Sequence, residues 1–133
     1  MNTTEQEVLD LVSRWAHVEL TGDVDAYADL LAEDFVGVGP VGFALDGEQW
    51  AQRHRGGLQN EEFDILEPNV RLHGDTAIVG AVQRQKTIAR GRDASGSFRL
   101  VLVAVRENGR WVIAHIQLSG PLIAPGETPS FVR

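Results

Sequence analysis

The last strand-like run of the chain, residues 109–119, reads Gly-Arg-Trp-Val-Ile-Ala-His-Ile-Gln-Leu-Ser and is its most informative segment. Apolar and polar side chains come close to alternating there, the pattern of a strand with one face against a core. His115 and Gln117 place an imidazole and an amide in this run. Because the chain opens with an amphipathic helix, this ending predicts helices packed on a curved sheet, with a few polar groups facing an apolar cavity.

Length and composition indicate one globular domain. The chain has 133 residues, of which 43% are hydrophobic and 23% charged, and it has no cysteine. This is enough to bury a core without disulfides, and it excludes thiolate nucleophiles and thiolate metal sites. The formal net charge of -7 disfavours nucleic acid, because a phosphate backbone requires a basic surface. We expect one domain over residues 1–119 and an irregular, proline-rich tail over residues 120–133.

Neither a membrane span nor a signal peptide is expected. No apolar run approaches the roughly 18 residues that a spanning helix needs. The first residues lack the basic and apolar regions of a signal peptide. We therefore expect a cytoplasmic protein that binds neither nucleic acid nor membrane.

The N-terminal third is predicted to be helical. Thr4 followed by Glu7 fits a capping box, and apolar residues then recur at helical spacing over residues 8–18. Gly22 is expected to end this helix. A second apolar stripe over residues 24–31 predicts a second helix.

The rest of the chain is predicted to be mainly β. A short strand at residues 35–39 and a third helix, from Asp46 as N-cap to the Gly56-Gly57 pair, lead into it. Segments rich in Val, Ile, Leu and Phe then alternate with hairpin-type turns. Helices followed by antiparallel strands predict an α+β fold, not alternating βαβ units. The predicted strands are 61–73, 76–90, 97–107 and 110–119.

Several short motifs occur in a characteristic order along these elements. They are Gly22-Asp23, residues 31–35 (Leu-Ala-Glu-Asp-Phe), residues 40–42 (Pro-Val-Gly), residues 70–77 (Val-Arg-Leu-His-Gly-Asp-Thr-Ala) and residues 109–113. In this order the chain resembles the NTF2-like superfamily, specifically its SnoaL-like and DUF4440 group, over about residues 4–119. The resemblance implies a cystatin-like cone, in which three N-terminal helices pack on the concave face of a strongly curved, mostly antiparallel sheet around an apolar pocket.

The resemblance also implies a partner. Homodimerisation through the open face of the sheet is common in the family. We expect Gln83, Gln85 and Leu102 to lie on that face.

Two known chemistries of this fold do not match the chain. Ketosteroid isomerases have a base before the proline that follows the first strand, where this chain has Gly39. Their tyrosine and acid donors correspond here to Trp15 and Val103. Without base and donors, that mechanism loses its electrostatic stabilisation. Limonene-epoxide hydrolases use an Asp-Arg-Asp group, and here Arg99 and Arg84 are present, but residues 76–90, 97–106 and 110–119 contain no acidic residue.

His115 is the leading candidate for acid–base catalysis. Histidine titrates near neutral pH, and a histidine in an apolar strand must be hydrogen-bonded or solvated. Asp34 would orient it, while Tyr27 or Gln117 would polarise a substrate carbonyl. The structural alternative is a hydrogen-bonded His115 on a partly exposed or dimer-facing sheet surface, with Asp34 at a helix end and Tyr27 in the core.

The sequence leaves open which face of the last strand looks into the pocket. One alignment turns the even-numbered residues of 114–118 inward, whereas the family's usual histidine-bearing strand turns the odd-numbered residues of 111–117 inward. A bulge would reconcile the two. A one-residue shift reverses every side chain, and a single sequence does not locate a bulge.

Other side chains are candidates for ligand binding. Trp50 and His54 share one face of the third helix, and Arg99 would clamp a carboxylate if it pointed inward. Core packing of the tryptophans, a helix-end role for His54 and an exposed Arg99 are the alternatives. No histidine spacing fits a metal site, so neither metal nor cofactor is expected. The predicted ligand-binding residues are Trp15, Trp50, His54, Arg99, Val103 and Gln117.

Two functions therefore remain open. The first is a cofactor-free isomerase, cyclase or dehydratase that acts on a small apolar or polycyclic molecule. The second is a non-catalytic ligand-binding or dimerisation module. The fold hosts both, so the site must decide between them.

Overall fold

Helix α1 (Thr3–Thr21) forms where the apolar residues recur at helical spacing, as predicted. In the computed structural model, which describes residues 3–122, this helix buries Val8, Leu11, Val12, Trp15, Val18 and, at its end, Glu19. Gly22 follows with a φ of 73°, a left-handed conformation that favours glycine and ends the helix.

The segment between the first helix and the long strands is more broken than predicted. The second helix is a short 3₁₀ helix, η1 (Val24–Asp29), and strand β1 (Leu31–Val38) begins earlier than residue 35 because its first residue already pairs with the last strand. Strand β2 (Ala44–Asp46) was not predicted. Helix α2 (Gly47–Gln52) starts at the predicted cap, where Asp46 and Gln49 form a capping box, but it ends before the glycine pair.

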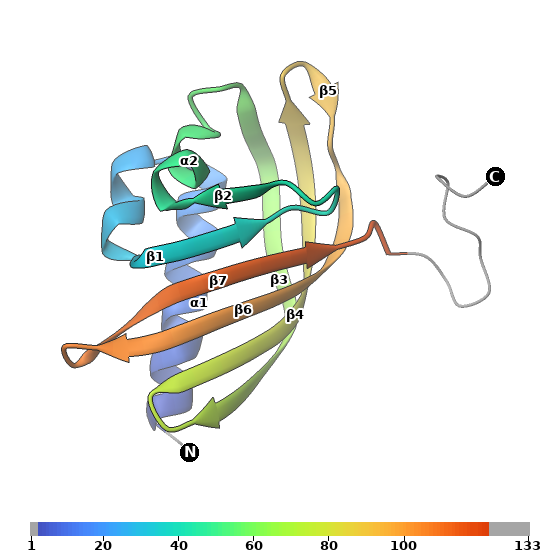
Figure 1. Ribbon diagram of the computed structural model, residues 1–133. Helices are drawn as coiled ribbons and strands as arrows, with labels where there is room; N and C mark the ends of the chain where they lie inside the picture. Colours follow the sequence, from blue (N-terminus) through green and yellow to red (C-terminus); the bar gives the residue numbers. More distant parts are fainter. Residues whose placement is uncertain (1–2, 123–133) are drawn as a thin grey trace.

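The remaining strands form the predicted meander. They are β3 (Leu58–His73), β4 (Thr76–Ala89), a short β5 (Arg92–Asp93) that pairs with β4, β6 (Gly96–Glu107) and β7 (Arg110–Ser119). The order across the sheet is β2-β1-β7-β6-β4-β3, with β1 and β7 parallel and the other pairs antiparallel. The α+β cone predicted from the sequence is confirmed (Figure 1).

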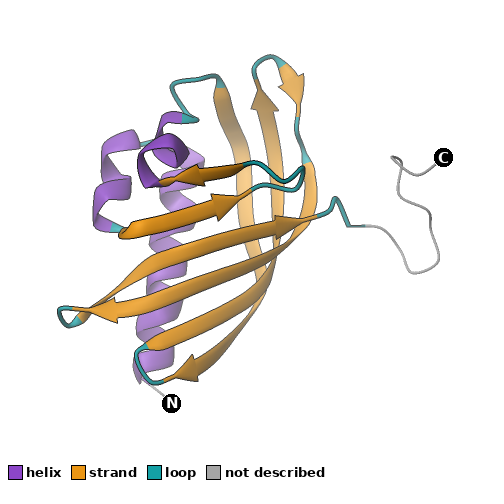
Figure 2. Ribbon diagram, in the orientation of Figure 1, coloured by secondary structure: helices purple, strands orange, loops and turns teal. Residues whose placement is uncertain are grey.

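The helices lie on one side of this curved sheet, as Figure 2 shows. Packing of α1 on β3 includes an edge-to-face contact between Trp15 and Phe63, with ring centroids 5.4 Å apart. The inner sheet face buries small and branched side chains such as Ala77, Val79, Leu100 and Leu102. The concave side is thus filled over most of its length.

A bulge in β7 answers the question that the sequence left open. Val103 of β6 pairs with His115, and the next residue, Ala104, pairs with Ile113, so Ala114 is an extra residue in β7. Trp111 and Ile113 are buried before the bulge, and Ile116 is buried after it. Each of the two alignments therefore holds for half of the strand. His115 and Gln117 consequently lie on the outer face of the sheet.

The residues of the neighbouring strands that pair with His115 and Gln117 lie on the same outer face of the sheet. Val36 of β1 and Val103 of β6 both pair with His115, and Val101 pairs with Gln117. Gln83, Gln85 and Leu102, predicted for this outer face, instead point inward. That prediction was wrong because β4 alternates from buried Ala77, Val79 and Ala81, which puts residue 83 on the inner side.

The limits of the described chain bear on two predictions. No helix within residues 3–122 is both long and apolar enough to cross a bilayer. Residues 120–122 have no regular structure, and the rest of the predicted irregular tail lies outside the described residues.

Candidate functional site

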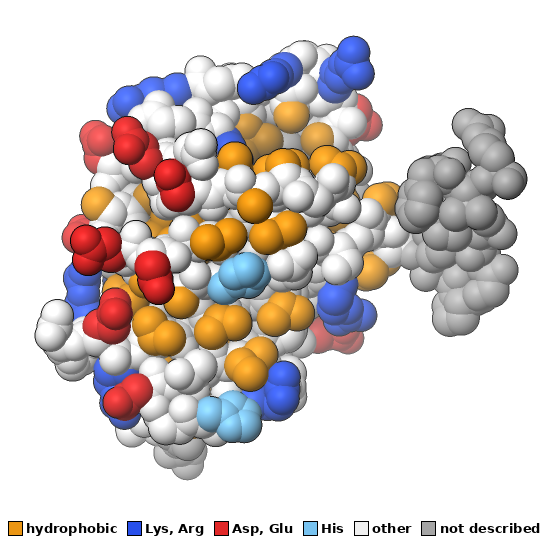
Figure 3. Space-filling view, viewed as in Figure 1, with side chains coloured by type: hydrophobic (Ala, Val, Ile, Leu, Met, Phe, Trp, Pro, Cys, Tyr) orange, Lys and Arg blue, Asp and Glu red, His pale blue; other side chains and the backbone are white. Residues whose placement is uncertain are grey.

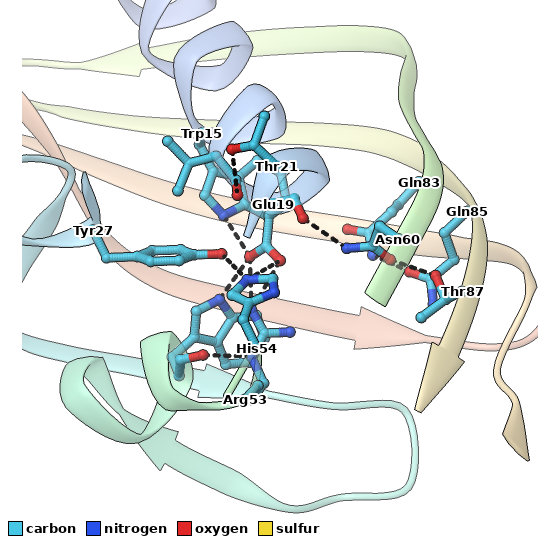
Figure 4. A network of polar contacts seen from close by, with 12 residues as sticks. Trp15, Glu19, Thr21, Tyr27, Arg53, His54, Asn60, Gln83, Gln85 and Thr87 are labelled. Atoms are coloured by element: carbon cyan, nitrogen blue, oxygen red, sulfur yellow. Dashed lines mark hydrogen bonds and ion pairs between the residues drawn. The ribbon is translucent and has the colours of Figure 1, made fainter. Parts of the chain in front are cut away.

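A buried carboxylate marks the inner face near the end of α1. Glu19 is 1% exposed, and both its oxygens are bound (Figure 4). The indole Nε1 of Trp15, one turn earlier, donates to it at 3.0 Å, and Trp50 Nε1 from α2 donates at 2.8 Å. Arg53 Nη2 lies 2.9 and 2.8 Å from the two oxygens. Burial of a carboxylate is costly unless it is paired and hydrogen-bonded, and here it is both.

Arg53 is held as firmly as its partner. The capping box at Asp46 fixes the start of α2, which puts Trp50 and Arg53, three residues apart, on one face. Arg53 Nε donates to the Trp50 carbonyl oxygen at 2.7 Å, and its guanidinium carbon lies 3.8 Å from the centroid of the Trp50 ring. The side chain is 20% exposed. The ion pair therefore forms part of the wall of the site and is not a mobile surface contact.

His54 and Tyr27 form a second pair beside the carboxylate. The Tyr27 hydroxyl and His54 Nε2 share a hydrogen bond of 2.7 Å, and Nε2 lies 3.7 Å from Glu19 Oε1. Burial lowers the pKa of His54, with the charge of Arg53 adding and that of Glu19 opposing. Burial, with Glu19 beside it, raises the pKa of Tyr27 far above its usual value. Both groups are therefore neutral at pH 7.

Amide side chains continue the polar surface onto the sheet. Asn60 of β3 donates from Nδ2 to the Glu19 carbonyl oxygen at 2.8 Å, and its Oδ1 accepts from the Thr87 hydroxyl. Gln83 Nε2 donates to Gln85 Oε1 at 2.7 Å, and Gln85 Nε2 donates to the Ala94 carbonyl oxygen at 2.9 Å. Gln83 is 3% exposed, and its Oε1 has no hydrogen-bond partner within residues 3–122.

These groups line a cavity of about 210 Å³ between the helices and the sheet. The aromatic rings of Phe43, Trp50, Phe63 and Phe98 contribute much of its apolar wall, and Leu58 and Leu118 add to it. Its polar wall consists of Glu19, Arg53 and three amide side chains, Asn60, Gln83 and Gln85. A wider groove of about 590 Å³ adjoins the cavity and shares Phe43, Arg53, Leu58 and Ala89 with it. The arrangement is an apolar cavity with a few fixed polar groups, as in small-molecule sites.

The structure brings four of the sequence-predicted residues together and separates the others. Trp50 lines the cavity, and Trp15 donates a hydrogen bond to the cavity residue Glu19. Tyr27 and His54 share a hydrogen bond next to Glu19. His115 and Gln117 hydrogen-bond to each other at 3.0 Å on the outer face. The expected pair of His115 with Asp34 is not among the hydrogen bonds or ion pairs within residues 3–122, and Asp34 is exposed.

Arg99 and Val103 also lie on the outer face, so the predicted carboxylate clamp does not face the cavity. In β6 the buried residues are Phe98, Leu100, Leu102 and Ala104, and strand alternation turns the odd-numbered ones outward.

Sequence reasoning missed the carboxylate and the amides. Glu19 had a signal, because it falls on the apolar stripe of the first helix four residues after Trp15. Arg53 follows Trp50 by three residues, which is the same kind of signal. Gln83 and Gln85 alternate with Arg84 and Lys86, so either pair could have faced inward.

No group of three His, Cys, Asp or Glu side chains within the described part of the chain is placed to hold a metal ion. The polar groups that line the cavity are three amides and one ion pair.

Comparison with known proteins places the chain in a family. Residues 8–124 match the SnoaL-like domain. The chain belongs to the SnoaL-like family. The part of the resemblance that pointed to the DUF4440 group stays a prediction. No curated protein gives a significant match to this SnoaL-like chain.

Solved structures share its fold at low sequence identity. An NTF2-like protein from Cytophaga hutchinsonii is 19% identical, with a TM-score of 0.83 over 90% of this chain and 99% of that one. A candidate Ca/calmodulin-dependent kinase II association domain from Exiguobacterium sibiricum is 21% identical, with a TM-score of 0.83 over 92% and 96%. An NTF2-like protein of unknown function in nutrient uptake from Rhodospirillum rubrum is 23% identical, with a TM-score of 0.81 over 86% and 98%. These likenesses establish the fold alone.

Proposed function

We propose that this SnoaL-like protein is a non-catalytic module that binds one small, mostly apolar molecule in its inner cavity. The observation that carries the proposal is the state of Glu19, the one carboxylate among the described residues that line the cavity. It is closed off by Arg53 and two indole N–H groups. A general base must reach a substrate proton with a free oxygen, and this carboxylate is committed to the fold.

The other acid–base candidates support the same conclusion. His115 lies on the outer face, bound to Gln117, and Asp34 is exposed. His54 shares a hydrogen bond with Tyr27 and is not among the residues that line the cavity. A cofactor-free isomerase, cyclase or dehydratase needs at least one such group beside the substrate, so these placements argue against that hypothesis.

The cavity favours a small ligand. Its volume of about 210 Å³ lies below the range of roughly 300–1,000 Å³ that holds drug-sized molecules. Four aromatic rings provide a large apolar contact area, and aromatic side chains favour flat or ring-shaped partners through stacked or edge-to-face contacts.

A blocked cavity tests the proposal. Ala89 lines both the cavity and the adjoining groove, so Ala89→Phe should fill the opening, whereas Ala44→Phe on the exposed edge strand β2 should not. We expect thermal shifts with uncharged aromatics or terpenoids in the wild type and in Ala44→Phe. A ligand at a concentration of 100 times its dissociation constant should raise the unfolding free energy by about 2.7 kcal/mol, which raises the Tm by several degrees. Equal shifts in Ala89→Phe, or no shift with any compound, would contradict cavity binding.

We also propose that the outer sheet face joins two copies of the chain. Val36 and Val101 are 38% and 37% exposed there, around the half-buried His115 and Gln117. Figure 3 shows hydrophobic side chains gathered over β1, β7 and β6 on this face. Exposed apolar patches of this kind mark interaction surfaces, and a twofold axis would let one patch cover its own copy. The name of one structural neighbour, an association domain, agrees with this proposal.

Light scattering tests the pairing. We expect the wild type to have twice its chain mass of 14.6 kDa, and Val101→Lys to be monomeric and folded. Val41→Lys is the matched control, because Val41 is 89% exposed in the loop between β1 and β2 and should leave the dimer intact. A monomeric wild type would refute the pairing and leave the cavity proposal untouched.

A further inference from the structure

One buried acceptor in the cavity lacks a partner. Gln83 lines the cavity from the inner face of β4 and is 3% exposed, and its Oε1 is buried without a hydrogen bond in the described chain. Buried polar atoms in folded proteins are nearly always satisfied, because an unpaired one costs free energy. An unpaired acceptor in a cavity wall therefore points to a group that enters the cavity and donates to it.

The orientation of this amide is fixed by its neighbours. The Ala94 carbonyl oxygen only accepts, so Gln85 must turn its Nε2 toward it, at 2.9 Å. That leaves Gln85 Oε1 facing Gln83, which must in turn present its own Nε2, at 2.7 Å. Rotating the Gln83 amide by half a turn would bring two carbonyl oxygens together. The unpaired atom of Gln83 is therefore an acceptor, and a ligand atom that bonds to it must be a donor.

The charges around the cavity indicate a neutral ligand. Glu19 and Arg53 are the charged side chains among the described residues that line it, and they cancel in one ion pair. A ligand carboxylate would lie near Glu19 without a cation of its own, and a ligand cation would compete with Arg53. Either charge would lose its hydration without compensation.

We infer that the cavity is built for an uncharged, mostly apolar molecule that carries one O–H or N–H group, which donates to Gln83 Oε1. This inference rests on the proposed function and deepens it, because it assigns Gln83 as the specificity-determining residue. The amide chain from Gln83 through Gln85 to the Ala94 carbonyl holds the acceptor in place, and the aromatic wall binds the apolar body of the ligand.

Indole and benzofuran are matched probes for this inference. They have nearly the same size and shape, but only indole donates a hydrogen bond. By titration calorimetry we expect the wild type to bind indole roughly fivefold to tenfold more tightly than benzofuran. Gln83→Met keeps the length of the side chain without the acceptor and should bring the ratio close to one. Gln59→Met, exposed on β3 and outside the cavity, should keep the wild-type ratio.

A second pair tests the charge. Indole-3-carboxamide and indole-3-carboxylate differ by one neutral-to-anionic change, and we expect the carboxylate to bind the wild type at least tenfold more weakly. A carboxylate that binds as tightly as the amide would overturn the requirement for a neutral ligand.

The outcomes separate this inference from the function on which it rests. If no probe binds the wild type, cavity binding fails and the inference fails with it. If benzofuran binds the wild type as tightly as indole, or if Gln83→Met keeps the indole preference, cavity binding stands and the assignment of Gln83 is wrong. The wild-type comparison does not depend on the folding of any variant.

Discussion

Between the helices and the inner face of the sheet, most polar side chains bind one another and are largely shielded from water, whereas on the outer face they lie among partly exposed valines. Glu19 accepts from two indoles and a guanidinium, and the indoles come from both α1 and α2. His115 has one hydrogen bond, to Gln117, on its own strand. The comparison shows that a titratable group in an apolar strand can lie on the face away from the cavity, and that the groups which shape the cavity are tied to several elements.

The largest effect is expected at the inner carboxylate. Glu19→Gln keeps the shape of the side chain but leaves the mostly buried Arg53 guanidinium without its counter-charge. Breaking one side of such a pair costs about 3–5 kcal/mol of unfolding free energy. Glu7→Gln, exposed on the same helix, should change it by less than about 0.5 kcal/mol. Urea unfolding of both variants measures the difference, and equal midpoints would mean that the buried network is not what holds α1 to α2.

A smaller effect is expected from a close approach on the inner face. A Cβ at Gly37 would lie 2.4 Å from the Trp50 ring, whereas one at Gly80 meets nothing within 4 Å. Gly37→Ala should therefore cost about 1–3 kcal/mol by overpacking, and Gly80→Ala should be neutral or slightly stabilising. Urea unfolding compares the two. Equal stability would show that Trp50 is not packed against β1 as described.

His54 should give the inner face a pH dependence. Burial lowers its pKa in the folded state, so below about pH 6.5 the unfolded chain binds a proton first. The unfolding free energy therefore decreases as the pH falls from about 6.5 toward the pKa of His54 in the folded state. The decrease is at most about 1.4 kcal/mol per pH unit.

Unfolding free energies at pH 7.5 and 5.5 test this dependence. The loss should be smaller in His54→Gln than in the wild type, while His17→Gln, exposed on α1, should keep the wild-type loss. The same loss in His54→Gln as in the wild type would assign the pH dependence to other groups.

The smallest effect is expected on the outer face. His115→Ala removes one half-buried hydrogen bond, so the unfolding free energy should fall by about 1 kcal/mol or less, and indole affinity should not change. Calorimetric titration and urea unfolding of this variant measure both quantities. A large loss of ligand affinity would place His115 in the binding site and reverse the comparison between the two faces.

The sequence predicted the fold well because periodicity and turn residues are local signals. The apolar spacing of α1, the Asp46 cap and the turns between the long strands all correspond to observed features. Which side chains of β7 face inward was not predictable. The extra residue, Ala114, switches the following side chains to the opposite face, and no residue type marks such a bulge. The site depends on that facing and on contacts such as Trp50 to Glu19, 31 residues apart, which periodicity does not carry.

A titration of the protein with the ligand indole, followed by ¹H–¹⁵N NMR, tests whether the inner cavity is the binding site. The probes are the side-chain N–H resonances of the three tryptophans. Trp50 lines the cavity, and Trp15 binds the same carboxylate from behind. Trp111 lies on β7 outside the lining residues, and its Nε1 has no partner within residues 3–122. We expect the Trp50 signal to move most, the Trp15 signal less, and the Trp111 signal hardly at all. Movement confined to backbone amides around Val36, Val101 and His115, with the Trp50 signal unchanged, would contradict cavity binding.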